Sequence, residues 1–163
     1  MKKAGFTFVE LIIVLAMLLV LTGAVFFVYL TSFRAWSTGQ DRLELRTELS
    51  QALEQMTMDL SDANSVYLES GNDNSLYFSQ ASAGYRLYLY NADDPAPPSY
   101  NQSVYSLLKS GVAESYGAGV TLATGVTPSV FTLTDGQTVS IDLNAIRNGS
   151  SVHMRTKVRP RNL

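Results

Sequence analysis

The sequence lacks the residues on which several chemistries depend. It contains no cysteine, so it can form no disulfide, no thiolate metal site and no cysteine-linked lipid anchor. Its one histidine, His153, lies in a strongly basic stretch and is more typical of a surface than of a metal ligand or general base. A G-x-S-x-G elbow, a phosphate loop and Cys/His metal spacing are also missing. We therefore expect no enzyme and no cofactor.

Charged residues are missing from a long segment near the N-terminus. Leu11 to Leu30 is free of charge, and a membrane-spanning helix needs about 20 apolar residues. Lys2 and Lys3 precede it, so the positive-inside tendency predicts a cytoplasmic N-terminus with everything after Leu30 outside. An ordinary secretory signal would have a shorter apolar region, roughly 7–15 residues, followed by a small-residue cleavage site. Here the small pair Ala4-Gly5 comes before the apolar run.

One carboxylate, Glu10, interrupts the apolar residues that begin at Phe6. An ionisable residue in such a segment costs free energy and is usually paired and functional. The alternative is that Glu10 only sits in the headgroup region, where the helix dipole favours a carboxylate near an N-terminus.

The short basic leader ending in Gly5, the apolar helix from Phe6 and the glutamate at Glu10 together resemble the class III signal of type IV pilins and pseudopilins. The resemblance implies that a prepilin peptidase cuts between Gly5 and Phe6, and that the new amine of Phe6 is N-methylated. It also implies that Glu10 pairs with this amine in a neighbouring subunit. The implied partners are other pilin or pseudopilin subunits, the peptidase/methyltransferase, an inner-membrane assembly platform and the lipid bilayer.

Beyond the apolar run, the helical pattern continues in an amphipathic form. Apolar residues recur at one face of a helix, at Leu45, Leu49, Leu53, Met56 and Leu60. Residues 46–63 are similar to a stretch of W-type minor pilins and J-type minor pseudopilins, through Leu49, Ala52-Leu53, Met56, Asp59-Leu60 and Ala63. The ending, residues 158–163, resembles the C-termini of the same families. Plain core packing of the helix would explain the apolar stripe equally well.

The rest of the chain has the pattern of a β-rich head. We predict strands at residues 65–69, 75–79, 85–90, 105–109, 130–134, 138–143 and 151–159. Turns are predicted at residues 71–74 and at Asp135-Gly136 and Asn148-Gly149, the last two being strong hairpin signals. The proline-rich residues 93–98 are predicted to be a loop. The glycine-rich residues 111–125 give no clear assignment.

Two charged clusters in the head raise further possibilities. Arg155, Lys157 and Arg159 alternate along the last strand, where they either guard an edge against aggregation or dock an acidic neighbouring subunit. Nucleic acid is disfavoured because the stripe lacks interleaved aromatics and the head is acidic. Asp93-Asp94 is interpreted as a solvated acidic turn, since Ca²⁺ prefers six to eight oxygen ligands.

These observations predict an α+β fold of the type IV pilin-like kind, with a long N-terminal helix packed on a compact antiparallel β-sheet. The expected parts are a leader (1–5), a transmembrane half (6–30), an amphipathic half (31–63) and a head (64–163). The expected function is that of a minor subunit that initiates or caps a type IV pilus or a type II secretion pseudopilus. It would start in the bacterial inner membrane with its head in the periplasm. A membrane-tethered periplasmic binding module is the main alternative, and a tethered hydrolase lacks a visible site.

Overall fold

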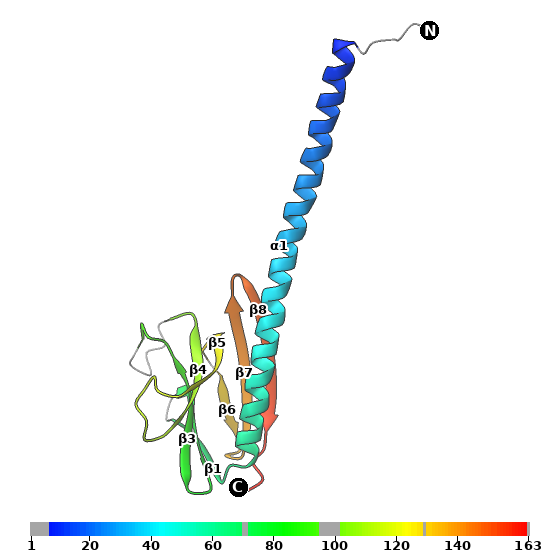
Figure 1. Cartoon of the computed structure of the whole chain (residues 1–163). Helices are drawn as coiled ribbons and strands as arrows, with labels where there is room; N and C mark the ends of the chain where they lie inside the picture. The colour runs from blue at the N-terminus through cyan, green and yellow to red at the C-terminus, as the bar shows by residue number, and fades with distance from the viewer. Residues whose placement is uncertain (1–6, 70–71, 95–101, 129, 163) are drawn as a thin grey trace. The chain divides into compact units, whose positions relative to one another are not determined.

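The structure, a computed structural model, describes residues 7–69, 72–94, 102–128 and 130–162 (Figure 1). These residues form one long helix, α1 (Phe8–Ser61), followed by β-strands. The strands are β1 (Ser65–Glu69), β2 (Asn72–Gln80), β3 (Ala83–Tyr90), β4 (Tyr105–Gly111), β5 (Val120–Val126), β6 (Phe131–Thr134), β7 (Thr138–Arg147) and β8 (Ser150–Val158). The predicted α+β architecture is confirmed.

The chain divides into two compact units, residues 1–40 and 41–163. The described part of the first unit is helical from Phe8 onward, and all of its described side chains are exposed. The second unit contains the rest of α1 together with the whole sheet. The hydrophobic core lies entirely in this second unit.

The sheet is antiparallel throughout, in the order β1-β2-β3-β4-β5-β7-β6, with β8 on the other side of β7. It curls, because β6 pairs with β7 and also lies near β1 and β2. A curled sheet offers a concave face that can surround one side of a helix.

The apolar face predicted for the second half of α1 is confirmed. Its five residues are buried, and they meet side chains from most strands of the sheet: Leu76, Phe78, Leu87, Leu107, Val126, Ile141 and Leu143. Burying one leucine or methionine side chain fully contributes about 1.5–3 kcal/mol. This stripe therefore accounts for why residues 41–61 belong to the head.

The sheet is weakest where β5 meets β7. The two strands share one residue pair, Val126 with Ala145, supplemented by the Thr127 amide, which donates to the Asn144 carbonyl at 2.8 Å. Gly125 has φ of 71°, and a Cβ there would lie 2.5 Å from the Ile146 carbonyl oxygen. Only glycine allows this approach. Strand β5 was not predicted, because small residues and glycines obscure its alternation.

The hairpin predictions have mixed outcomes. The Asp135-Gly136 and Asn148-Gly149 turns are confirmed, with positive φ at all four residues. The turn predicted at 71–74 is wrong in extent, because β2 already begins at Asn72, which pairs with Glu69. The other predicted strands are confirmed, β7 continuing beyond residue 143 to Arg147. In the predicted loop, residues 95–98 lie outside the described residues.

Candidate functional site

The predicted assembly site lies at the start of α1. Gly5 and Phe6 fall outside the described residues, but Thr7 and Glu10 are placed. The Glu10 amide donates to the Thr7 side-chain oxygen at 3.3 Å, so Thr7 caps the helix and Glu10 occupies its first turn. This Thr-x-x-Glu spacing is that of a capping box. The exposed Glu10 carboxylate therefore sits where the helix dipole favours a negative charge and where a partner can reach it.

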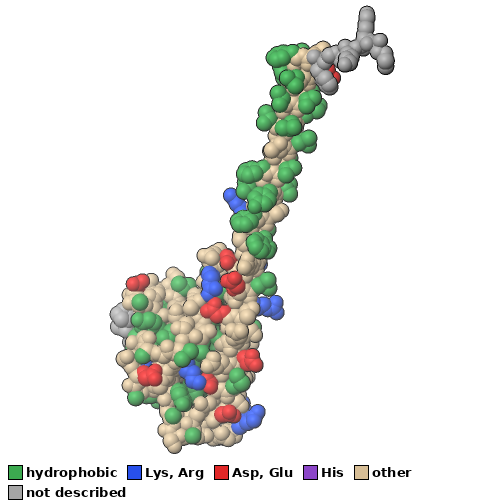
Figure 2. Space-filling view, viewed as in Figure 1, with side chains coloured by type: hydrophobic (Ala, Val, Ile, Leu, Met, Phe, Trp, Pro, Cys, Tyr) green, Lys and Arg blue, Asp and Glu red, His purple; other side chains and the backbone are tan. Residues whose placement is uncertain are grey.

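Apolar side chains cover the helix that follows Glu10 (Figure 2). By length and composition, the helix is long and apolar enough to cross a membrane. Two threonines, within or next to the apolar run, donate their hydroxyl hydrogen bonds to backbone carbonyls of the same helix. Thr22 donates to the Leu18 carbonyl at 2.8 Å, and Thr31 donates to the Phe27 carbonyl at 2.9 Å. Such internal bonds suit a hydrocarbon environment, which offers no water as a partner.

A polar clamp holds α1 at the weak junction of the sheet. The Glu48 carboxylate accepts from the Thr124 amide at 2.6 Å, the Thr124 hydroxyl at 2.9 Å and the Arg147 guanidinium at 2.7 Å. Glu48 thus joins the helix to β5 and β7 together. Burial alone would raise the pKa of Glu48, but the hydrogen bonds from Arg147 and Thr124 outweigh burial and lower this pKa below its ordinary value of 4.5.

A second ion pair joins α1 to β4 near the C-terminal end of the helix. The Lys109 ammonium lies 2.6 Å from the Asp59 carboxylate, and both side chains are less than one-fifth exposed. The same ammonium lies 5.1 Å from the centre of the Tyr85 ring. The partners of Glu48 and Asp59 were not predicted, because no local sequence pattern signals contacts between residues 50 to 99 positions apart.

Two members of the predicted basic stripe, Arg155 and Lys157, lie on β8, whereas Arg159 follows the end of the strand at Val158. Exposed Arg155 and Lys157 alternate with the half-buried Met154 and Thr156, as predicted. Asp142 of β7 partly neutralises the stripe, since its carboxylate lies 2.5 Å from His153 and 3.7 Å from the Arg155 guanidinium. Arg159 donates to the Gln137 side-chain oxygen at 2.9 Å.

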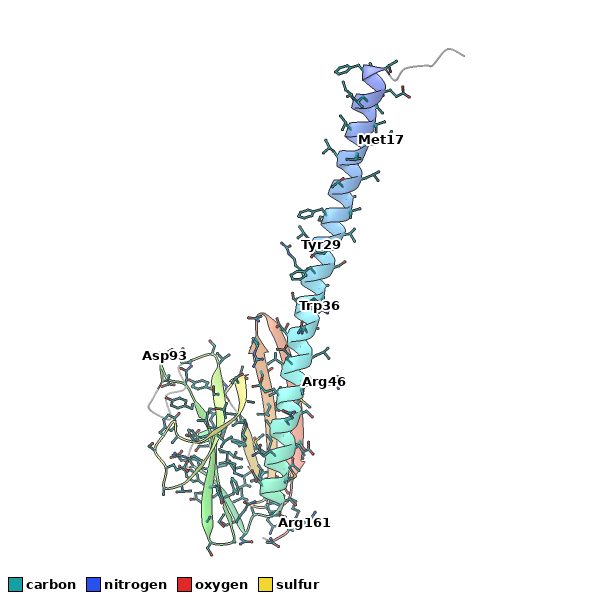
Figure 3. The ribbon with its side chains drawn as sticks, in the orientation of Figure 1. Met17, Tyr29, Trp36, Arg46, Asp93 and Arg161 are labelled. Atoms are coloured by element: carbon teal, nitrogen blue, oxygen red, sulfur yellow. The ribbon has the colours of Figure 1, made fainter. Side chains whose placement is uncertain are left out.

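The acidic pair on the head lies in a tight turn (Asp93 is labelled in Figure 3). The Asp93 amide donates to the Asn91 side-chain oxygen at 2.9 Å. Asp94 is buried and accepts a hydrogen bond from the Tyr105 hydroxyl at 2.9 Å. The prediction of a solvated turn is therefore wrong for Asp94, which has a buried, structural role. Within the described ranges, no cluster of three or more His, Cys, Asp or Glu side chains could hold a metal ion.

Comparison with known families supports the interpretation of the N-terminus. Residues 1–26 match the family described as the prokaryotic N-terminal methylation motif. This motif family is structural rather than enzymatic, and the match supports the predicted type IV pilin-like family. Comparisons with curated proteins and with solved structures gave no match.

We predict that Glu48→Gln destabilises the head and flattens its acid response. The lowered pKa means that the ionised form stabilises the fold above pH about 4.5, and that this contribution is lost as the pH falls through the folded-state pKa. Losing the charged hydrogen bonds should cost about 1.5–3 kcal/mol near pH 7. Urea unfolding of the full chain in detergent, from pH 7 to pH 3, measures the effect.

The matched control is Glu54→Gln, an exposed glutamate on the same helix. It should leave both the stability and its pH dependence close to the parent protein. Equal stability losses in the two variants, or an unchanged acid response for Glu48→Gln, would contradict the clamp.

Proposed function

We propose that this chain is a minor pilin or pseudopilin subunit, held in the bacterial inner membrane by residues 6–30 with its head in the periplasm. It would enter a type IV pilus or a type II secretion pseudopilus, near the start or the tip of the fibre. The observation that carries the proposal is Glu10, an exposed carboxylate in the first turn of an apolar helix, within a matched methylation motif. A simple membrane tether needs neither this carboxylate nor the Gly5-Phe6 junction.

The chemistry of Glu10 supports a role in assembly. Cleavage after Gly5 would leave an α-amine on Phe6, with an ordinary pKa of about 7.7–8.0, and methylation would keep it protonatable. In a bundle of apolar helices, an unpaired carboxylate is costly. Pairing Glu10 with the Phe6 amine of a neighbour would satisfy the two charges and set the axial offset between subunits.

The packing of α1 in the head is consistent with the proposed relation to minor subunits. The residues shared with W-type minor pilins and J-type minor pseudopilins are Leu49, Ala52, Leu53, Met56, Asp59, Leu60 and Ala63. The apolar members are all buried against the sheet, and Asp59 holds Lys109. The similarity therefore concerns the packing of the helix against the sheet. It does not involve the outer surface of the head, which can differ between pili and secretion systems.

We predict cleavage between Gly5 and Phe6, followed by methylation of the Phe6 amine. Mass spectrometry of the N-terminal peptide from the native host measures both steps. The expected peptide begins with N-methyl-Phe6 and disappears when the prepilin peptidase is deleted. A mature chain that starts at Met1, or after a conventional cut near Ala24, would overturn this prediction.

We predict that Glu10→Leu abolishes or strongly reduces entry into the fibre while the head stays folded. Removing one partner of a buried ion pair costs about 3–5 kcal/mol. Recovery of the subunit in sheared filaments is measured beside its membrane level and its thermal unfolding. Thr22→Val is the control, because it also makes the apolar segment less polar but removes only an internal hydrogen bond. Normal assembly of Glu10→Leu would refute the pairing role.

We predict that the basic stripe docks an acidic face of another minor subunit. Replacing Arg155, Lys157 and Arg159 together by Gln should abolish salt-sensitive co-purification with the other minor subunits, with little loss of head stability, because exposed ion pairs contribute only about 0–1 kcal/mol. Asp142→Asn is the control, since it removes the acidic partner of His153 and Arg155 but keeps the cations. Unchanged co-purification of the triple variant would leave the stripe as an edge guard.

A further inference from the structure

An exposed row of aromatic side chains follows the apolar run of α1. Tyr29, Phe33 and Trp36 are spaced by four and three residues, so they lie along one side of the helix. The ring centres of Tyr29 and Phe33 are 6.4 Å apart, and those of Phe33 and Trp36 are 6.3 Å apart. The three side chains are 63%, 53% and 65% exposed. Figure 3 labels Tyr29 and Trp36 on this part of the helix.

The position of this row matches the expected edge of a bilayer. The charge-free segment Leu11–Leu30 would span about 30 Å at 1.5 Å per residue, the thickness of a hydrocarbon core. Arg34 is the first charged residue after Glu10, and polar residues follow it at Ser37 and Thr38. The aromatic row therefore begins where the hydrocarbon would end.

The chemistry of the row fits the headgroup region. Tyrosine and tryptophan combine an apolar ring with a polar group, and both are enriched at membrane–water interfaces. Arg34 lies between Phe33 and Trp36 in the chain, and a guanidinium can bind a phosphate through two parallel hydrogen bonds. A cation on a long stem can also reach the interface while its methylene groups stay among lipid tails.

We propose that Tyr29, Phe33 and Trp36, together with Arg34, form an interfacial anchor that binds phospholipid headgroups of the outer leaflet. The anchor deepens the proposed function and rests on its membrane-spanning segment. Trp36 lies 26 positions after Glu10, which corresponds to about 39 Å of helix at 1.5 Å per residue. A bilayer with its headgroups is about 40–45 Å thick. The anchor would thus keep Glu10 at the inner boundary until assembly draws the helix out of the membrane.

The single tryptophan of the chain gives a direct test. The full mature protein is reconstituted into phosphatidylcholine/phosphatidylglycerol vesicles that carry quenchers at the headgroup, at a shallow acyl position or at a deep acyl position. The anchor predicts that Trp36 is quenched most by the headgroup and shallow probes, and only weakly by the deep probe and by aqueous iodide.

Other quenching profiles would overturn the anchor. Strong iodide quenching with no lipid quenching would place Trp36 in water. Maximal quenching by the deep probe would place it in the hydrocarbon. If no lipid probe quenches Trp36, and quenching appears once the protein is diluted with more lipid, a second protein chain covers Trp36.

Variants separate the anchor from the membrane span. In Tyr29→Ser with Phe33→Ser, Trp36 should lose its shallow quenching maximum, whereas Phe26→Leu, within the apolar run, should keep it. Arg34→Gln should reduce the dependence of the quenching profile on the anionic lipid. Co-flotation of the protein with vesicles is measured throughout. If the protein fails to float with the vesicles, the membrane-spanning part of the proposed function is wrong. If the Tyr29→Ser, Phe33→Ser variant floats and its Trp36 quenching profile is unchanged, only the anchor is wrong.

Discussion

Burial of one apolar stripe of α1 against the curled sheet is the constraint on which the fold depends. Leu45, Leu49 and Met56 are almost completely inaccessible to solvent, whereas every described side chain of the same helix before residue 41 is exposed. The sheet curls so that β6 lies near β1 and β2, and a curled sheet can cover more of this stripe than a flat one. Each half of α1 thus requires a different environment: the second half has its own sheet, and the exposed apolar first half needs lipid or other helices.

Polar contacts then fix how the helix is seated. Apolar packing is non-directional and would tolerate some rotation or sliding of the helix. Glu48 removes this freedom at one point, because its carboxylate must meet donors from β5 and β7 at once. Asp59 removes it at another through Lys109. Glu48 also bridges the place where Gly125 brings β5 against β7 with few ladder hydrogen bonds, so the helix compensates for a weak point of the sheet.

The sequence predicted the features that local physics determines. Helical spacing identified the buried face of α1, Asp135-Gly136 and Asn148-Gly149 marked their turns, and strict alternation identified β8. Other features depend on partners that are far away in the chain. Arg147 meets Glu48 across a separation of 99 residues, and no local pattern predicts that choice. Strand β5 was missed because Gly119 and Gly125 serve close backbone contacts, which conceals the strand signal. At the candidate site, the matched motif supports the interpretation of Gly5, Phe6 and Glu10, whereas their individual roles stay predictions.

In the proposed assembly role, the position of Glu10 would reconcile two conflicting requirements. A carboxylate deep in a bilayer would oppose insertion of the unassembled subunit, yet assembly by charge pairing needs a carboxylate that is desolvated when subunits meet. Glu10 lies in the first turn, which Thr7 caps, and the helix dipole favours a negative charge there. Its desolvation cost would then arise only as the helix enters a bundle, where an amine from a neighbouring chain can offset it. In the proposed assembly, placing the charge at the end of the apolar run, rather than in its middle, would lower the cost of inserting the free subunit while keeping an unpaired carboxylate costly in the bundle.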